Sequence, residues 1–317
     1  MDKKPMIVLT GPTAVGKTAL SIELAKKING AIISADSMQI YKHMDIGSAK
    51  IMPDEMENIP HYLVDELEPD EEFNIVRFQQ MAKDALEEIY ANNKIPIITG
   101  GTGFYIQGLL YDIDFTKQDA DIEFRNKMEK YAMENGEHAL HELLKDIDYE
   151  SYMTIHENNV KRVIRALEYY HLTKKPISVH NKEEQNKKSP YNFLYFVLND
   201  DRENLYNRIE KRVDIMLEKG LVDEVKKLKD MGYNKKMVSM QGLGYKEILD
   251  YLDGECTLEE AIYILKRDTR HFAKRQLTWF RREKDVIWVN KNEYNYDETR
   301  ILNDMYTKIE EKGIVRS

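Results

Sequence analysis

Apolar residues follow two patterns along the first third of the chain. Short unbroken apolar runs alternate with longer segments in which an apolar side chain recurs every three or four residues. The runs predict buried strands, and the periodic segments predict amphipathic helices. Strands that alternate with helices up to about residue 110 indicate an α/β fold with a parallel sheet. We expect strands at residues 6–10, 30–34, 60–65 and 95–99, and helices at residues 19–27 and 73–90.

The pattern changes after about residue 110. We predict charged helical segments at residues 112–144 and 158–172. A polar lysine-rich loop is expected at 181–190, and a strand at 191–199. We therefore predict a mostly helical insertion at 117–189, within a core domain formed by residues 1–116 and 190–317. The remainder of the core is expected to contain helical segments and a last strand, at residues 203–231, 258–282 and 287–289.

The first predicted strand runs into the sequence GPTAVGKT, which a predicted helix follows. Strand, glycine loop and helix in this order match the phosphate-binding pattern G-x-x-x-x-G-K-[ST]. Backbone N–H groups of such a loop converge on an anion at a helix N-terminus, where the helix dipole favours negative charge. Lys17 adds a positive charge, and Thr18 offers a hydroxyl to Mg²⁺. The predicted phosphate-binding residues are Gly11, Pro12, Thr13, Ala14, Val15, Gly16, Lys17 and Thr18.

Acidic residues follow two of the predicted strands. Asp36 comes just after the strand at 30–34, and ligands of parallel sheets bind beyond the carboxyl ends of the strands. Asp36 therefore faces the same crevice as Lys17, where it fits a Mg²⁺ ligand, a general base or a plain N-cap. Asp65 fits either a Mg²⁺ ligand or a strand-end cap. The GGTG turn at 100–103 lets backbone approach a ligand closely, but taken alone it also fits a simple tight turn.

Composition narrows the class of protein. The chain has 317 residues, 42% of them hydrophobic and 32% charged, which is typical of a globular protein. Its longest apolar run, at 193–198, is too short to cross a membrane, and the N-terminal residues lack the apolar stretch of a signal peptide. Cys256 is the only cysteine, which excludes an intrachain disulfide and a thiolate zinc cluster. We expect a cytoplasmic protein with no membrane partner.

Charge is unevenly distributed. The net charge is −9, yet residues 266–284 contain eight Lys or Arg, whereas residues 54–72 contain nine acidic residues and no Lys or Arg. A negative total can conceal a local basic face that binds nucleic acid. The alternative is an ordinary solvated helix. Basic side chains recur at helical spacing in two sets, Lys161, Arg162 and Arg165, and Arg267, Arg270, Lys274 and Arg281.

Several motifs occur together in one order. They are GPTAVGKT, SADSMQIYKHMDIGSAK at 34–50, IPHYLVDE at 59–66, ITGGTGFYIQ at 98–107, RIEKRVDIMLEKGLVDEV at 208–225, GYKE at 244–247 and KRQLTWFRR at 274–282. In this combination the chain resembles the tRNA dimethylallyltransferases, the bacterial isopentenyl transferases that modify an adenosine beside the anticodon. The resemblance covers nearly the whole chain, although residues 157–159 read Glu-Asn-Asn where the family often has Pro-Asn-Asp.

The resemblance implies a P-loop kinase-like core that transfers a dimethylallyl group from dimethylallyl diphosphate. The acceptor would be N6 of adenosine 37 in the anticodon stem-loop of tRNAs that read codons beginning with U, with Mg²⁺ as cofactor and the protein as a monomer. Asp36 matches the family's general base, and Arg212 matches its diphosphate-binding arginine, for which Arg208 is an alternative. The implied tRNA contacts are Asp36, Ser37, Met38, Gln39, Thr102, Arg125, Lys161, Arg162, Arg165, Gln241, Gly244, Tyr245 and Lys246.

Two other functions compete with this interpretation. A small-molecule P-loop kinase would use ATP and would need an arginine-rich lid, for which the insertion at 117–189 is a superficial match. The DSMQIYK and AKRQLTWFR segments have no place in such a kinase. An RNA-binding module with a relict P-loop would carry a damaged loop, whereas Gly16, Lys17 and Thr18 are all intact.

Overall fold

The computed structural model describes residues 3–115 and 121–315, apart from the side chain of Gln185. The chain forms two compact units, the first made of Met1–Leu110 and Pro190–Ser317 and the second of Tyr111–Ser189. The boundary that we placed between residues 116 and 117 lies outside the described residues.

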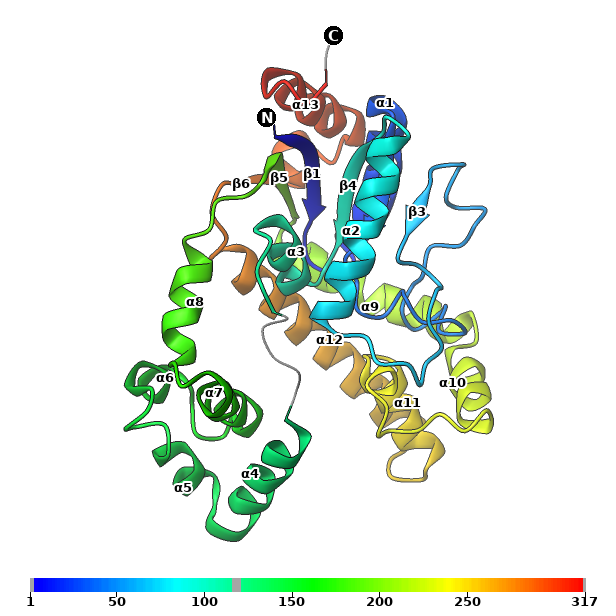
Figure 1. Ribbon diagram of the computed structural model, residues 1–317. Coiled ribbons are helices and arrows are strands. Elements are labelled where there is room, and N and C mark those ends of the chain that lie inside the picture. The colour runs from blue at the N-terminus through cyan, green and yellow to red at the C-terminus, as the bar shows by residue number, and fades with distance from the viewer. Residues whose placement is uncertain (1–2, 116–120, 316–317) are drawn as a thin grey trace. The chain divides into compact units, whose positions relative to one another are not determined.

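A six-stranded parallel sheet forms the centre of the first unit. Its strand order is β3-β2-β4-β1-β5-β6, so the first strand of the chain lies in the interior of the sheet (Figure 1). On β1, Val8 pairs with Ile98 of β4 on one side and with Tyr195 of β5 on the other. The strands are β1 Lys4–Thr10, β2 Gly30–Ser34, β3 His61–Tyr62, β4 Ile95–Gly100, β5 Tyr191–Asn199 and β6 Val286–Asn290. The prediction of an α/β fold with a parallel sheet is confirmed.

Helices bury the apolar faces of this sheet. Side chains alternate between the two faces of a strand, and on β1 Ile7 and Leu9 point into a cluster with α1 and α13 that includes Leu24 and Met305. The α-helices of the first unit are α1 Lys17–Ile28, α2 Ile75–Ala91, α3 Gly103–Leu110, α9 Arg202–Glu218, α10 Leu221–Asp230, α11 Tyr245–Leu252, α12 Leu258–Phe280 and α13 Glu298–Glu311. The 3₁₀ turns η1 Ser239–Gln241 and η2 Lys291–Tyr294 complete it.

The second unit is helical and has its own small core. Leu140, Leu144, Val163 and Leu167 are buried there, and Met128 packs against the same cluster. The helices are α4 Ile122–Asn135, α5 Glu137–Glu142, α6 Tyr149–Thr154, α7 Val160–Thr173 and α8 Ile177–Gln185.

Three local predictions need correction. The expected loop at 181–190 is wrong in its first half, because α8 continues to Gln185. The helical region at 203–231 is two helices, since Gly220 has a left-handed backbone with φ of 96° that ends the first and begins the second. The strand expected at 60–65 is only two residues long, because Leu63 and Asp65 both adopt positive φ and leave the extended conformation.

Candidate active site

The predicted phosphate-binding loop connects β1 to α1 at the carboxyl edge of the sheet. Gly16, with φ of 99°, is the residue before the first helical residue, Lys17, so the N–H groups of the first turn of α1 open toward the loop. Gly11 is needed for close approach, because a Cβ there would lie 2.5 Å from the Leu198 carbonyl oxygen of β5. The predicted order of strand, loop and helix is therefore present.

Lys17 lies inside the loop. Its Nζ donates hydrogen bonds to the carbonyl oxygens of Gly11, at 2.9 Å, and Pro12, at 2.8 Å. The pKa of Lys17 is lowered to about 7, chiefly by burial and next by the positive charge of Arg212, while the negative charge of Asp36 acts in the opposite direction. Two basic side chains thus lie close together with one carboxylate beside them, an arrangement that a bound anion would stabilise in its fully protonated, cationic form.

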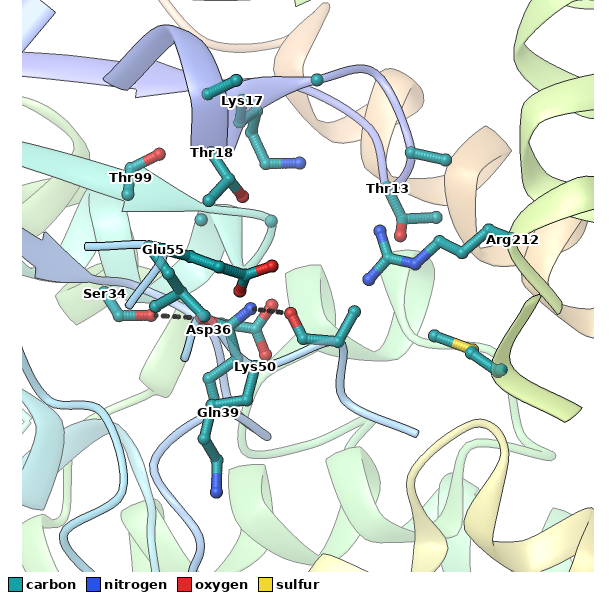
Figure 2. Close-up of a pocket in the computed structure, with 18 of the residues that line it drawn as sticks. Thr13, Lys17, Thr18, Ser34, Asp36, Gln39, Lys50, Glu55, Thr99 and Arg212 are labelled. Atoms are coloured by element: carbon teal, nitrogen blue, oxygen red, sulfur yellow. Dashed lines mark hydrogen bonds between the residues drawn. The ribbon is translucent and has the colours of Figure 1, made fainter. Parts of the chain in front are cut away.

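Arg212 reaches the same pocket from α9 and points toward Lys17 (Figure 2). Burial lowers the pKa of its guanidinium, and Asp36 acts against that shift. Among the residues that the structure describes, Arg212 has no hydrogen-bond or ion-pair partner. Arg208, one turn earlier, is already engaged: its Nε lies 3.8 Å from Asp200 Oδ2, and its Nη1 lies 3.5 Å from the Val15 carbonyl oxygen. The geometry therefore favours Arg212 as the arginine available to a ligand.

Asp36 follows β2 and lines the pocket with Lys17, Thr18 and Arg212. Its Oδ1 accepts a hydrogen bond from the Met38 N–H at 2.9 Å, which fixes the carboxylate within a local turn. Within 3–115 and 121–315, Oδ2 has no hydrogen-bond donor. One oxygen of Asp36 thus caps a local turn, and the other remains available to a ligand.

The pocket has a volume of about 1110 Å³ and is built entirely from the first unit. Helix α9 contributes one wall, on which Lys211 lies near apolar Ile215 and Met216, and Lys219 follows at the end of the helix. This wall combines cationic and apolar side chains, which suits a ligand with an anionic head and a hydrocarbon tail.

A loop at 45–50 forms another wall, and sequence reasoning missed the residue that holds it. The carboxylate of Glu224 on α10 accepts three backbone N–H groups, from Asp45 at 3.0 Å, Ile46 at 2.8 Å and Gly47 at 3.1 Å. It also accepts the Tyr245 hydroxyl at 2.9 Å. Glu224 stands within a motif of the resemblance, but nothing in its local sequence shows that it holds a loop about 180 residues away.

Lys50 anchors the end of this loop. Its Nζ is buried and donates to Asp45 at 2.6 Å and to Asp65 at 2.7 Å. The carboxylate of Asp65 is thus paired with a lysine, and Asp65 is not among the residues that line the pocket. Of the two roles that the sequence allowed for Asp65, this geometry favours the structural one.

The predicted tRNA contacts of the first unit differ in accessibility. Gln241 is exposed, whereas the Tyr245 side chain is fully buried, and its hydroxyl also accepts the Ser48 N–H at 3.1 Å. Tyr245 therefore supports the protein's own backbone and does not present its side chain at the surface. The half-buried residues are Ser37, Met38, Gln39, Thr102 and Lys246, and Gly244 is buried at the start of α11.

The predicted contacts of the second unit separate into two pairs. Arg125 and Arg165 both hydrogen-bond to the fully buried Glu168, at 2.7 Å and 2.8 Å. Burial alone would raise the pKa of Glu168, and these hydrogen bonds hold it below its ordinary value. Lys161 and Arg162 are exposed, with no ion-pair partner among the described residues. Only this second pair has charges that are not used internally.

The basic face predicted on α12 is likewise only partly available. Arg270 pairs with Glu210 of α9 at 2.6 Å, and Arg267 pairs with Asp268 at 2.8 Å. Lys274 and Arg281 are exposed and lack such a partner within the described ranges.

The oxygen atoms near the loop are the candidate ligands for the expected Mg²⁺. The described residues contain no group of three or more His, Cys, Asp or Glu side chains placed to hold a metal ion. The Thr18 hydroxyl and the Asp36 carboxylate do line the pocket described above. Mg²⁺ commonly uses one or two protein ligands and completes its shell with water and substrate phosphates. The donor set therefore fits an ion shared with a bound diphosphate.

Across the described part of the chain, every helix is too short or too polar to span a lipid bilayer.

Comparison with known proteins identifies the family. The model of the IPP transferase family matches residues 39–283. A curated tRNA dimethylallyltransferase from Lachnoclostridium phytofermentans is 61% identical over 99% of this chain and 100% of its own length. The crystal structure of a tRNA isopentenylpyrophosphate transferase from Bacillus halodurans is 43% identical, covers 98% of both chains and has a TM-score of 0.73. A eukaryotic dimethylallyltransferase acting on tRNA is 32% identical over 90% of this chain and 74% of its own, with a TM-score of 0.76. The chain belongs to the IPP transferase family.

Proposed function

We propose that this protein transfers a dimethylallyl group from dimethylallyl diphosphate to N6 of adenosine 37 in tRNAs that read codons beginning with U. The observation that supports this most directly is the convergence of Lys17, Arg212 and Asp36 on one pocket, two cations and one carboxylate (Figure 2). The names of the relatives, tRNA dimethylallyltransferase and tRNA isopentenylpyrophosphate transferase, agree with it.

The leaving group of this reaction is diphosphate, so the site must stabilise negative charge that develops on an oxygen. We assign that task to the N–H groups at the start of α1 and to Lys17 and Arg212, whose side chains line the pocket. The Thr18 hydroxyl would hold Mg²⁺ against the diphosphate, where the ion supplies further neutralisation of the phosphate charge.

The acceptor nitrogen needs a base. The lone pair of adenine N6 is delocalised into the ring, and its N–H becomes acidic only as the new bond forms. The bond between the allylic carbon and the diphosphate oxygen breaks with its electrons on oxygen, while N6 forms the C–N bond and one N6 proton passes to Asp36. The free Oδ2 of Asp36 is the acceptor, because Oδ1 is bound to the Met38 N–H. A base placed in this way contributes roughly 10²–10⁴-fold in rate.

The RNA backbone would bind to exposed cations. The exposed cations without an ion-pair partner among the described residues are Lys161 and Arg162 of the predicted tRNA contacts, and Lys274 and Arg281 of the predicted basic face. Contacts of this kind position an RNA without reading its sequence. We further propose a monomeric, cytoplasmic enzyme, in keeping with the tRNA substrate and the single cysteine.

The test is the mass of an anticodon stem-loop RNA after incubation with the protein, dimethylallyl diphosphate and Mg²⁺. A gain of one C5 allyl unit is expected, and none is expected when adenosine 37 is replaced by guanosine. Incubation with ATP in place of the allyl donor should leave the RNA and small-molecule acceptors unphosphorylated. Robust phosphoryl transfer from ATP, with no allyl transfer, would establish the kinase alternative instead.

A further inference from the structure

One buried side chain connects the two glycine turns of the pocket. Gln276 of α12 accepts the Thr13 N–H of the phosphate-binding loop on Oε1 at 2.9 Å. Its Nε2 donates to the Gly101 carbonyl oxygen of the GGTG turn, also at 2.9 Å. The side chain is 6% exposed, and it lines the pocket together with Thr13 and Gly101. Both ends of one amide are therefore used to join two loops that follow neighbouring strands.

The residue types at this contact are specific. A primary amide is the neutral side chain that offers a donor and an acceptor at the same distance from the backbone, and it brings no charge into the anion site. Gly101 leaves the room that the amide occupies, since a Cβ at that position would overlap with Gln276 Nε2. The contact thus depends on a glutamine on α12 and on a glycine in the turn.

Further hydrogen bonds connect the GGTG turn, and with it Gln276, to the segment that contains Asp36, the proposed base. The turn after β4 is hydrogen-bonded to the end of β2, because the Thr102 N–H donates to the Ala35 carbonyl at 3.1 Å and the Ala35 N–H donates to the Thr99 carbonyl at 2.7 Å. Asp36 is the next residue. Contacts therefore run from the phosphate-binding loop through Gln276 and the GGTG turn to the residue beside Asp36.

We propose that Gln276 is a positioning residue that fixes the phosphate-binding loop relative to the local turn that contains Asp36. This role rests on the proposed transfer reaction, in which the allylic carbon and N6 must be aligned between those two segments. Misplacement of reacting groups by about 1 Å costs on the order of 10²-fold in rate. The Thr13 N–H is used by the protein itself, which leaves the later N–H groups of the loop to the ligand.

The experiment compares Gln276→Leu, Gly101→Ala and their double variant, with exposed Gln80→Leu as a matched control. Leucine fills the space without either polar atom, and the alanine methyl displaces the amide from the opposite side. We expect each single variant to lower kcat by about 10- to 100-fold, with tRNA affinity unchanged. The double variant should be no slower than Gln276→Leu alone, because both substitutions break the same contact between Gln276 and the GGTG turn. Gln80→Leu should match the wild type.

Hydrogen exchange of the Thr13 amide gives a readout that does not depend on catalysis. It should accelerate in Gln276→Leu and in Gly101→Ala, and stay unchanged in Gln80→Leu. Unchanged exchange, additive losses in the double variant, or wild-type kcat in folded Gln276→Leu would each overturn the positioning role. Failure of the wild type to add an allyl group would instead refute the proposed function, and the exchange measurement would still show whether the bridge orders the loop.

Discussion

Lys17 should take up a proton when the allyl donor binds. Burial and the nearby charge of Arg212, partly offset by Asp36, lower its pKa to about 7. Near neutral pH the free protein is therefore a mixture of ammonium and neutral amine. A diphosphate beside Nζ favours the ammonium, so the bound state holds the proton that part of the free population lacks.

The expected magnitude follows from that pKa. At pH 8 a group with a pKa of about 7 is roughly nine-tenths neutral, so binding should take up about 0.9 proton per donor. At pH 7 the uptake from this group should be about 0.5 proton, and between pH 7 and pH 8 the affinity should weaken about fivefold. Affinity for the donor therefore falls as the pH rises, because a higher pH removes from Lys17 the proton that binding needs.

Calorimetric titration with dimethylallyl diphosphate and Mg²⁺, in buffers of different ionisation enthalpy at pH 8, measures the uptake directly. Lys17→Arg is the matched control, because a guanidinium remains protonated at this pH and should bind without uptake. The reasoning is refuted if the wild type takes up no proton at pH 8, or if Lys17→Arg takes up the same amount.

Three further outcomes are expected. Asp36→Asn keeps the size of the side chain but cannot accept a proton, so single-turnover assays should show a rate lower by roughly 10²–10⁴-fold, with tRNA affinity in filter binding nearly unchanged; a near-normal rate would remove Asp36 as the base. Replacing Lys161 and Arg162 with Ala should make the negative slope of log K against log salt for tRNA binding less steep by about one to two units, with affinity for the allyl donor unchanged. An unaltered slope would show that these two side chains are ordinary solvated charges. Tyr245→Phe leaves the half-buried carboxylate of Glu224 without one donor and should lower the free energy of unfolding in urea by about 1–3 kcal/mol. Unchanged stability would show that the loop is held by other contacts.

Local sequence determined the elements of the core. The apolar run that ends at Thr10, the GPTAVGKT loop and the periodic segment after it specify strand, loop and helix from neighbouring residues alone. Gly16 illustrates why: its φ of 99° is a local requirement that glycine meets without steric cost. A parallel α/β sheet follows from the repetition of such units, and the motifs in their order indicated the family.

Element boundaries depended on contacts beyond the local sequence. The polar stretch after residue 180 reads as a loop, yet α8 extends to Gln185. Its first turn is held from outside, because the Ser178 N–H donates to buried Asp148 and Ile177 packs against the core of the second unit. Helix propensity alone is too weak a guide where tertiary contacts stabilise a polar helix.

Only the tertiary structure decided which side chains meet at the pocket. Arg208 and Arg212 are equivalent by sequence spacing, but Asp200 at the end of β5 engages the first and leaves the second facing Lys17. Gln276 finds its partner Thr13 at a separation of 263 residues. Periodicity reports which face of an element is apolar, but it carries no information on which distant element packs there. The distinction between charges used inside the protein and charges left for a ligand therefore arises only when the sheet and its helices are assembled.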